Sequence, residues 1–260
     1  MGNQEVIISE NIEKELTAAI SRCVYDKLFI LVDKTTEKNC LPLVSGLEDI
    51  KKGKLIVIGS TDVHKTLETL AYVWTELGNC GGTRHSLLVI IGGGMVTDLG
   101  GFAASTFKRG INYINIPTTL LSMVDASVGG KTGINFNGLK NEVGVFNAAN
   151  SVIIDTNFLR TLDVYNLCSG YAEMLKHGLI SNEKNWAELI NFEIQTPNFD
   201  QLRRMVADSV MIKEKIVKED PHEHGIRKAL NLGHTVGHAF ESLSLAENRP
   251  VLHGYAVAWG

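Results

Sequence analysis

Two histidines near the end of the chain are its clearest candidates for chemistry. His234 and His238 lie four residues apart in LNLGHTVGHAFE, a spacing that places both imidazoles on one face of a helix. A glycine precedes each histidine and leaves room for a ligand to approach. His253 follows on the next apolar run, and Glu173 lies upstream. Imidazoles combined with a carboxylate predict a metal site; ordinary core or surface histidines are the alternative interpretation.

A glycine-rich turn in the first half of the chain predicts an anion site. The apolar run Leu88–Ile91 leads directly into Gly92, Gly93 and Gly94, and a segment with helical spacing follows. Glycine permits close backbone approach, and the free N–H groups at a helix N-terminus attract phosphate. The spacing is not G-x-G-x-x-G, so the usual dinucleotide fingerprint is absent. A nucleotide pyrophosphate is the functional interpretation, and a tight strand-to-helix connection is the alternative.

A second glycine turn, residues 124–133, is similar to the end of a P-loop. A P-loop requires glycine where this chain has Asp125, so kinase or ATPase chemistry is poorly supported. Lys131 among these glycines still suits a phosphate, because its compact ammonium can reach an anion held by the backbone. The alternative is a solvated lysine on a surface loop.

The elements that must position these residues change character near residue 155. Before it, short β-rich runs alternate with helical segments, a pattern typical of a parallel α/β sheet. The predicted strands are Leu28–Val32, Lys54–Ile58, Leu87–Ile91, Tyr113–Ile116 and Val152–Ile154. The predicted helices are Lys65–Glu76, Val96–Ser105, Tyr165–Ile180, Lys184–Ile194, Phe199–Val217 and Lys228–Leu243. We therefore expect an α/β nucleotide-binding domain with a parallel sheet over residues 1–155 and an all-α domain over residues 156–260.

Composition narrows the class of protein. The 260 residues are 44% hydrophobic and 21% charged, with a net charge of −4, which is typical of a globular protein and gives no case for a nucleic-acid partner. No secretion signal or membrane-spanning run is visible. The four cysteines are scattered, as expected for reduced thiols in a cytoplasm. The apolar segment from Val251 has no terminator before Gly260, so we expect the chain to be a C-terminally truncated piece.

Five motifs, in this order, make the chain resemble the 3-dehydroquinate synthases of the sugar-phosphate cyclase superfamily. The motifs are GGGMVTDLGGFAASTFKRG, IPTTLLSMVDASVGGKTGIN, LKNEVGVF, SGYAEMLKHGLI and LNLGHTVGHAFE. The resemblance implies NAD bound by the α/β domain and a divalent metal, usually zinc and alternatively cobalt, held by Glu173, His234 and His253. Three protein ligands leave coordination positions open, as catalytic zinc requires. His177, although four residues after Glu173, matches no ligand of the family.

The resemblance also implies the residues that contact the cofactor. The match to the dinucleotide-binding turn and to further cofactor contacts covers Gly93, Gly94, Met95, Asp98, Thr118 and Thr119. Asp33 ends an early strand, where a carboxylate can accept hydrogen bonds from a ribose hydroxyl. Asp62 and Lys65 stand where the family has Glu-x-x-Lys, so the acid is one methylene shorter. A helix start with an acidic first-turn residue is the alternative for this pair.

On the substrate side, the resemblance implies a set of cations and amides for a phosphorylated keto-acid. The residues that match positions around the phosphate are Lys131, Asn141, Asn231 and His238. Lys213 and Arg227 match those that hold the carboxylate, and Arg227 could do so through two parallel hydrogen bonds. The residues that match positions around the hydroxyls are Asp125, Lys140 and Lys176. Arg109 matches an arginine supplied to the neighbouring subunit, which implies a homodimer.

The implied substrate is 3-deoxy-D-arabino-heptulosonate 7-phosphate, converted to 3-dehydroquinate and phosphate. The family oxidises C5 with NAD, eliminates phosphate, returns the hydride and closes the ring by an aldol step, so NAD is not consumed. His238, with Lys131 or a water, is the candidate for proton transfer. The alternatives are a sibling cyclase acting on another sugar phosphate, an NAD-dependent polyol dehydrogenase, and an inactive NAD-binding fragment.

Overall fold

The computed structural model describes residues 4–247 and 249–260, and the chain divides into two compact units. The first unit runs up to Thr118 and continues over Gly130–Thr161. The second unit comprises Thr119–Gly129 and Leu162–Gly260. The chain therefore passes between the units three times. The division at residue 155 into a nucleotide-binding domain and a helical domain stays a prediction.

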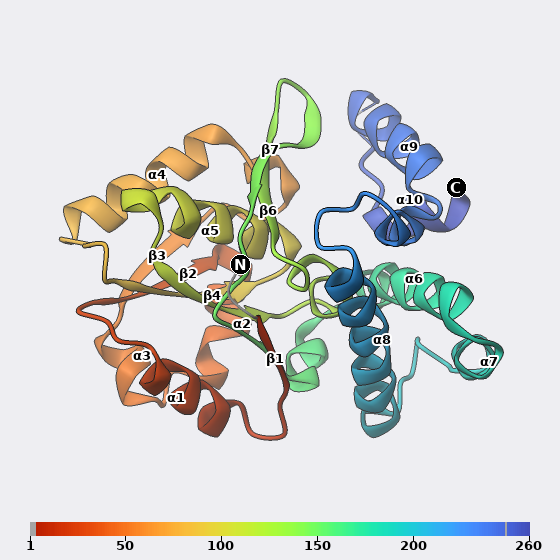
Figure 1. The fold of residues 1–260 in the computed structure, drawn as a ribbon, viewed down its shortest axis with the longest axis horizontal. Helices are drawn as coiled ribbons and strands as arrows, with labels where there is room; N and C mark the ends of the chain where they lie inside the picture. The colour runs from red at the N-terminus through yellow and green to blue at the C-terminus, as the bar shows by residue number, and fades with distance from the viewer. Residues whose placement is uncertain (1–3, 248) are drawn as a thin grey trace. The chain divides into compact units, whose positions relative to one another are not determined.

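A six-stranded parallel sheet forms the centre of the first unit, in the order β1-β8-β5-β4-β2-β3 (Figure 1). Its strands are β1 (Glu5–Ile8), β2 (Leu28–Asp33), β3 (Lys54–Ile58), β4 (Leu87–Gly92), β5 (Asn112–Pro117) and β8 (Ser151–Ile154). Every residue of β2 and β4 is buried, which explains their continuous apolar runs. The five predicted strands and the α/β class are confirmed; β1 was not predicted.

Helices cover both faces of this sheet. Figure 1 shows α1 (Ile12–Arg22) and α3 (Glu48–Lys52) on one side of the strands, with α4 (Leu67–Asn79) and α5 (Gly94–Thr106) on the other. The short helix α2 (Lys34–Asn39) directly follows β2. Helices α4 and α5 confirm two predicted helices, although α4 starts two residues later than the sequence suggested.

A β-hairpin of the first unit was also not predicted from the sequence. Strands β6 (Lys131–Phe136) and β7 (Leu139–Phe146) pair antiparallel, where the sequence suggested only a glycine-rich loop around Lys131. The turn between them is Asn137-Gly138, with φ of 50° and 79°. An Asn-Gly pair between apolar segments is a strong hairpin signal, so this turn could have revealed the hairpin.

Five helices build most of the second unit: α6 (Val164–Ser181), α7 (Glu183–Ile190), α8 (Phe199–Glu219), α9 (His234–Ala246) and α10 (His253–Trp259). The all-helical character predicted for this part of the chain is confirmed over the described residues. The single helix predicted over Lys228–Leu243 is wrong. A 3₁₀ segment, Ile226–Asn231, precedes Gly233, whose φ of 80° ends it, and α9 begins only at His234.

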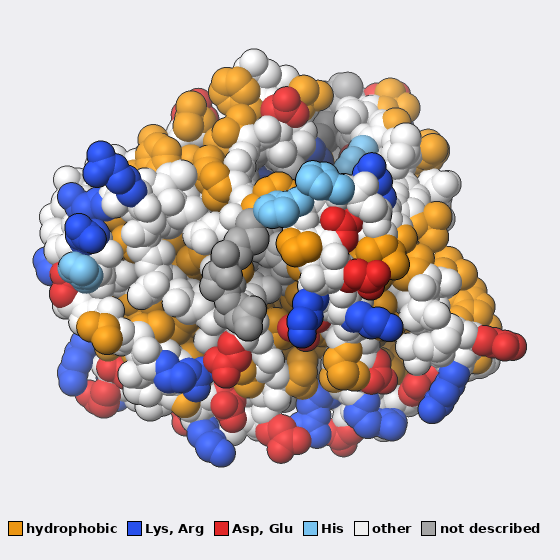
Figure 2. Space-filling view, viewed as in Figure 1, with side chains coloured by type: hydrophobic (Ala, Val, Ile, Leu, Met, Phe, Trp, Pro, Cys, Tyr) orange, Lys and Arg blue, Asp and Glu red, His pale blue; other side chains and the backbone are white. Residues whose placement is uncertain are grey.

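Charged side chains of both signs are interspersed over the face shown in Figure 2, with hydrophobic side chains scattered between them. Among the described residues, no helix combines the length and the apolar character that crossing a membrane requires.

Burial of the sheet makes a direct stability test possible. Ile90 in β4 is 0% exposed, whereas Val24 is 89% exposed. Replacing Ile90 with alanine should lower the free energy of unfolding by about 2–5 kcal/mol, because the lost contacts leave a cavity. Denaturant unfolding followed by circular dichroism measures this, with Val24→Ala as the exposed control. Equal effects of the two substitutions would contradict the described core.

Candidate functional site

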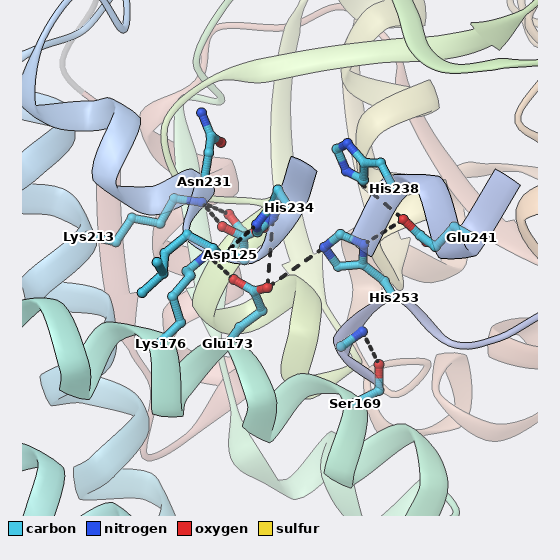
Figure 3. A network of polar contacts seen from close by, with 12 residues as sticks. Asp125, Ser169, Glu173, Lys176, Lys213, Asn231, His234, His238, Glu241 and His253 are labelled. Atoms are coloured by element: carbon cyan, nitrogen blue, oxygen red, sulfur yellow. Dashed lines mark hydrogen bonds and ion pairs between the residues drawn. The ribbon is translucent and has the colours of Figure 1, made fainter. Parts of the chain in front are cut away.

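Three side chains of the second unit converge as a candidate metal centre (Figure 3). Glu173 lies on α6, while His234 and His253 are the first residues of α9 and α10. The Nε2 atom of His234 is 3.9 Å from Glu173 Oε1, and the Nε2 atom of His253 is 3.7 Å from the same oxygen. The three residues implied by the resemblance are therefore brought together, although they come from three different helices.

Each histidine is oriented by a hydrogen bond at its other ring nitrogen. His234 Nδ1 is 3.2 Å from the carbonyl oxygen of Leu232, and His253 Nδ1 is 3.2 Å from Glu241 Oε2. A carbonyl and a carboxylate both accept, so each Nδ1 carries the proton and donates it. Each Nε2 is then left with its lone pair facing Glu173, which is the tautomer that a metal ligand requires.

The donor set fits a divalent metal. Glu173 is 0% exposed, and its Oε1 has no hydrogen-bond partner among the described residues. A buried polar atom without a partner is costly, and a cation at this point would remove that cost. Zinc bonds of 2.0–2.2 Å in tetrahedral geometry separate neighbouring ligand atoms by about 3.4 Å, close to the two distances above. Two imidazoles and one carboxylate leave an open position for a substrate oxygen.

The two histidines differ in their electrostatic surroundings. Burial, and then the nearby Lys176 ammonium, lower the pKa of His234 to about 4, so this imidazole is neutral at pH 7. Burial also acts to lower the pKa of His253, but the hydrogen bond and charge of Glu241 outweigh it and raise that pKa. Burial, followed by the negative charge of Asp125, raises the pKa of Glu173 despite the opposing effect of Lys176.

Two buried lysines hold the carboxylates next to this centre. Lys176 Nζ donates to Glu173 Oε2, and Lys213 Nζ donates to both the side chain and the main-chain oxygen of Asp125. Burial acts to raise the pKa of Asp125, but Lys213 and Lys176 outweigh it and hold that pKa well below its ordinary value. Burial lowers the pKa of Lys213 in turn. Asp125 is therefore ionised and fixed in place.

His177 lies beside the same carboxylates but is not needed as a ligand. Its Nδ1 is 2.7 Å from Ser209 Oγ, and its Nε2 has no hydrogen-bond partner among the described residues. Burial and the Lys176 charge lower its pKa to about 3. Asp125, Glu173 and His177 could also group around a cation. The expectation that His177 is not a ligand stays a prediction.

The other substrate-side residues of the second unit have protein partners. Arg227 is buried and donates from Nη1 to Pro221 O (2.7 Å) and from Nη2 to Gly129 O (3.1 Å). Its bidentate contact with a substrate carboxylate stays a prediction. Asn231 donates to Glu223 Oε1 at 2.5 Å. His238 is half exposed, and its Nε2 lies 4.0 Å from Glu241 Oε2.

Within the first unit, strand order places the candidate cofactor turn at a position where α/β sheets bind ligands. The chain leaves β2 toward β3 on one side and leaves β4 toward β5 on the other. Ligands typically bind at the carboxyl ends of two neighbouring strands whose connections diverge in this way. Asp33 ends β2, while Gly93 and Gly94 follow β4 and begin α5 without a side-chain cap. Asp33 and the glycine turn, which we predict to contact NAD, therefore both lie at the carboxyl ends of β2 and β4.

Further predicted cofactor residues cluster near the same end of the sheet. Asp98, on α5, accepts from Lys65 Nζ at 2.6 Å, and Lys65 also donates to Asn141 Oδ1 on the hairpin. Thr118 N donates to Gly92 O at 2.9 Å, which joins the ends of β5 and β4. Met95 lies in the first turn of α5. Lys65 thus links one cofactor residue and one residue assigned by resemblance to the substrate phosphate.

Some of these residues also have structural roles. Asp33 Oδ1 caps α2 by accepting from Thr35 N and Thr36 N. Asp62 accepts from Asn135 Nδ2 at 3.2 Å and lies 3.4 Å from Lys140 Nζ. The structure therefore places Lys140, assigned by resemblance to substrate hydroxyls, beside a residue assigned to the cofactor.

The remaining predicted residues occupy turns and strand ends. Lys131 is exposed at the start of β6. Thr119 shares a hydrogen bond of 2.9 Å with Ser122 Oγ. Arg109 is exposed with φ of 71° in the turn before Gly110. The predicted contacts of Lys131, Thr119 and Arg109 with substrate or cofactor stay predictions.

Sequence reasoning missed two partners of the helices that carry the candidate metal ligands, Glu241 and Ser169. Glu241 is 1% exposed beside His253. Ser169 Oγ accepts from Gly254 N at 3.0 Å, where α10 begins against α6. A Cβ at Gly254 would lie 2.8 Å from Ser169 Cα and closer to its carbonyl group, so only glycine allows this approach. The signal for Glu241 was its place in GHAFE, three residues after His238.

Because Lys213 and Asp125 form an ion pair, the Lys213→Met variant should have a lower free energy of unfolding than the wild type, by an amount that depends on pH. Lys213 is buried and the Asp125 side chain is 25% exposed, so removing the ammonium should cost at most about 3–5 kcal/mol at pH 7. Because the folded-state pKa of Asp125 lies below its ordinary value of 3.8, the stabilisation is complete well above this pH and is lost as the pH falls further. The gap between wild type and variant should therefore shrink in acid.

Denaturant unfolding at a series of pH values measures this gap. Lys215→Met is the matched control, since Lys215 lies on the same helix and is exposed. A gap that is the same for both substitutions, or independent of pH, would contradict the buried pair.

The sequence and the fold of this chain are similar to those of known proteins. Residues 55–169 match the family 3-dehydroquinate synthase N-terminal, and residues 170–260 match 3-dehydroquinate synthase C-terminal. A 3-dehydroquinate synthase of Parabacteroides distasonis is 56% identical over 100% of this chain, which covers 74% of that protein.

Two solved structures share the fold. A 2-epi-5-epi-valiolone synthase of Streptomyces hygroscopicus, with NAD⁺ and Zn²⁺ bound, is 28% identical with a TM-score of 0.83, over 99% of this chain and 72% of its own. A 2-deoxy-scyllo-inosose synthase complexed with carbaglucose-6-phosphate, NAD⁺ and Co²⁺ is 25% identical with a TM-score of 0.83, over 97% and 70%. With both halves matched, the chain belongs to the 3-dehydroquinate synthase family.

Proposed function

We infer that this protein is a 3-dehydroquinate synthase, a lyase of the shikimate pathway of aromatic amino acid and chorismate biosynthesis. It converts 3-deoxy-D-arabino-heptulosonate 7-phosphate to 3-dehydroquinate and phosphate, with NAD and a divalent metal as cofactors. The observation that carries this inference is the convergence of Glu173, His234 and His253 around an unpartnered carboxylate oxygen in a chain 56% identical to a named synthase. The chain spans 74% of the length of that relative.

The chain's own residues prepare the metal centre. A bound Zn²⁺ or Co²⁺ would polarise the substrate hydroxyls and lower the cost of removing a proton from them. Glu173, His234 and His253 would hold it. Lys176 keeps Glu173 oriented through its second oxygen, and the Leu232 carbonyl and Glu241 keep each imidazole in the tautomer that can bind.

The carboxyl ends of β2 and β4 would hold the dinucleotide. When bound, NAD supplies the acceptor and donor of hydride. The N–H groups at the start of α5, where Gly93, Gly94 and Met95 lie, suit its pyrophosphate. Asp33 would accept from a ribose hydroxyl. Asp98 and Lys65, paired at 2.6 Å, would position this part of the pocket, with Asp62, Thr118 and Thr119 as further contacts.

Cations and amides would hold the phosphate and the carboxylate of the substrate. We assign the phosphate to Lys131, Asn141, Asn231 and His238, and the carboxylate to Lys213 and Arg227. Asp125, Lys140 and Lys176 would contact the hydroxyls. His238 is the proposed proton-transfer group, because its imidazole is half exposed on α9 and can reach a ligand there.

Sibling cyclases are the second candidate, and sequence identity argues against them. The two sibling enzymes are 25–28% identical, against 56% for the Parabacteroides synthase. Lys213 and Arg227 also suit a carboxylated substrate. We further propose a homodimer, to which Arg109 contributes across subunits, and a cytoplasmic location, where the four free cysteines stay reduced.

The function is tested by supplying the heptulosonate phosphate with zinc and a catalytic amount of NAD. Phosphate and 3-dehydroquinate should form in equal amounts, many turnovers per NAD, because the hydride returns to the product. Phosphate release and dehydroquinate absorbance measure this. Glu173→Gln should lose metal affinity and turnover while keeping NAD binding, whereas the exposed Glu183→Gln should change neither. Steady NADH accumulation would indicate a dehydrogenase, and NAD binding without turnover would indicate a non-catalytic protein.

A shared dimer site predicts complementation between two inactive variants. In a mixed dimer of Arg109→Ala and Glu173→Gln, one site receives an intact Arg109 from its partner and keeps its own Glu173. Random reassociation should restore roughly a quarter of wild-type activity, while each variant alone stays inactive. Activity after mixing and refolding measures this. Failure to recover activity from a confirmed mixed dimer would show that Arg109 does not act across subunits.

A further inference from the structure

Glu241 is a buried carboxylate that lies beside two histidines. It lies on α9 with 1% of its surface exposed. Its Oε2 atom is 3.2 Å from His253 Nδ1 and 4.0 Å from His238 Nε2. An ionised carboxylate is rarely buried unless it has a specific partner, and the hydrogen bond from His253 supplies one.

The bond to Glu241 completes a chain of contacts that determines the direction of the His253 ring. Nδ1 points to Glu241, so Nε2 on the opposite side of the ring points to Glu173 Oε1 at 3.7 Å (Figure 3). The backbone is held independently, because Gly254 N donates to Ser169 Oγ at 3.0 Å. A Cβ at Gly237 would be only 3.0 Å from the Ala256 carbonyl, so α9 and α10 pack closely here.

We propose that Glu241 is a positioning residue of the metal centre, holding the His253 ring so that Nε2 faces the metal shared with Glu173 and His234. The proposal rests on the metal centre described under the proposed function. A carboxylate acceptor at Nδ1 fixes the imidazole tautomer and orientation and makes the ring a stronger donor to the metal. His234 has only a carbonyl in the equivalent place, so the two ligands are supported unequally.

A direct metal site at Glu241 is the competing arrangement. His238, Glu241 and His253 also have ligand atoms within 4.8 Å of one another. A metal there would use His253 Nδ1 and displace its hydrogen bond to Glu241. It would also leave Glu173 Oε1 buried without a partner, at a cost in free energy. The geometry therefore favours Glu241 as the hydrogen-bond acceptor of His253 Nδ1 and not as a ligand of the metal.

The test measures metal affinity on the metal-free protein. Zn²⁺ affinity is determined by competition with a chelator, and Co²⁺ binding by its visible absorption spectrum. Glu241→Ala should weaken Zn²⁺ binding by about 10- to 100-fold and alter the Co²⁺ spectrum. Glu241→Gln should recover most of the affinity, because its amide oxygen still accepts from Nδ1. Glu247→Gln, an exposed glutamate just beyond α9, is the control for charge and should match wild type.

Thermal unfolding of each metal-free variant separates positioning from folding. If Glu241→Ala does not fold, Glu241→Gln of nearly equal shape carries the test, with a smaller loss of affinity and a shifted Co²⁺ spectrum expected. Unchanged affinity and spectrum in a folded Glu241→Ala would overturn the proposal. Loss of all binding in both Glu241 variants, with normal binding in Glu173→Gln, would also overturn it and make Glu241 a ligand. If wild type itself bound neither metal, the metal centre of the proposed function would fail first.

Discussion

The buried Glu173 carboxylate places the strongest constraint on the second unit. One of its oxygens accepts from Lys176, and the other faces two imidazoles with no hydrogen-bond partner among the described residues. A buried oxygen without a hydrogen-bond partner costs free energy, and a bound cation would remove that cost. The starts of α9 and α10 both approach α6 at this point, where the Nε2 atoms of His234 and His253 lie 3.9 and 3.7 Å from Glu173 Oε1.

Paired charges extend from this point through the second unit. Lys213 and Asp125 form a second buried pair, and the opposite charges offset the cost of desolvating each group. The pairing keeps Asp125 ionised although burial opposes it. The first unit repeats the arrangement with Lys65 and Asp98 at 2.6 Å. In both units a carboxylate thus holds the ammonium group of a buried lysine in one place.

Backbone breaks decide where the functional side chains lie. Gly233, with φ of 80°, separates the 3₁₀ segment that carries Asn231 from the helix that begins with His234. A continuous helix would have directed these residues along one face only. The break allows His234 Nδ1 to bond to the Leu232 carbonyl, two residues back. Close packing at Gly254 has a similar effect for His253, because it seats the first turn of α10 on Ser169.

The sequence by itself determined the α/β class and five strands, because buried strands are apolar, and its resemblance to a known family predicted three metal ligands. It also pointed to the triple-glycine turn, where local backbone freedom and a helix start coincide. The split of the helix at Gly233 and the place of Glu241 beside His253 were decided only by the tertiary structure. Asp125 and Lys213 are 88 residues apart in the chain. Periodicity reveals which face of an element is buried, but the partner across the core depends on how all the elements pack.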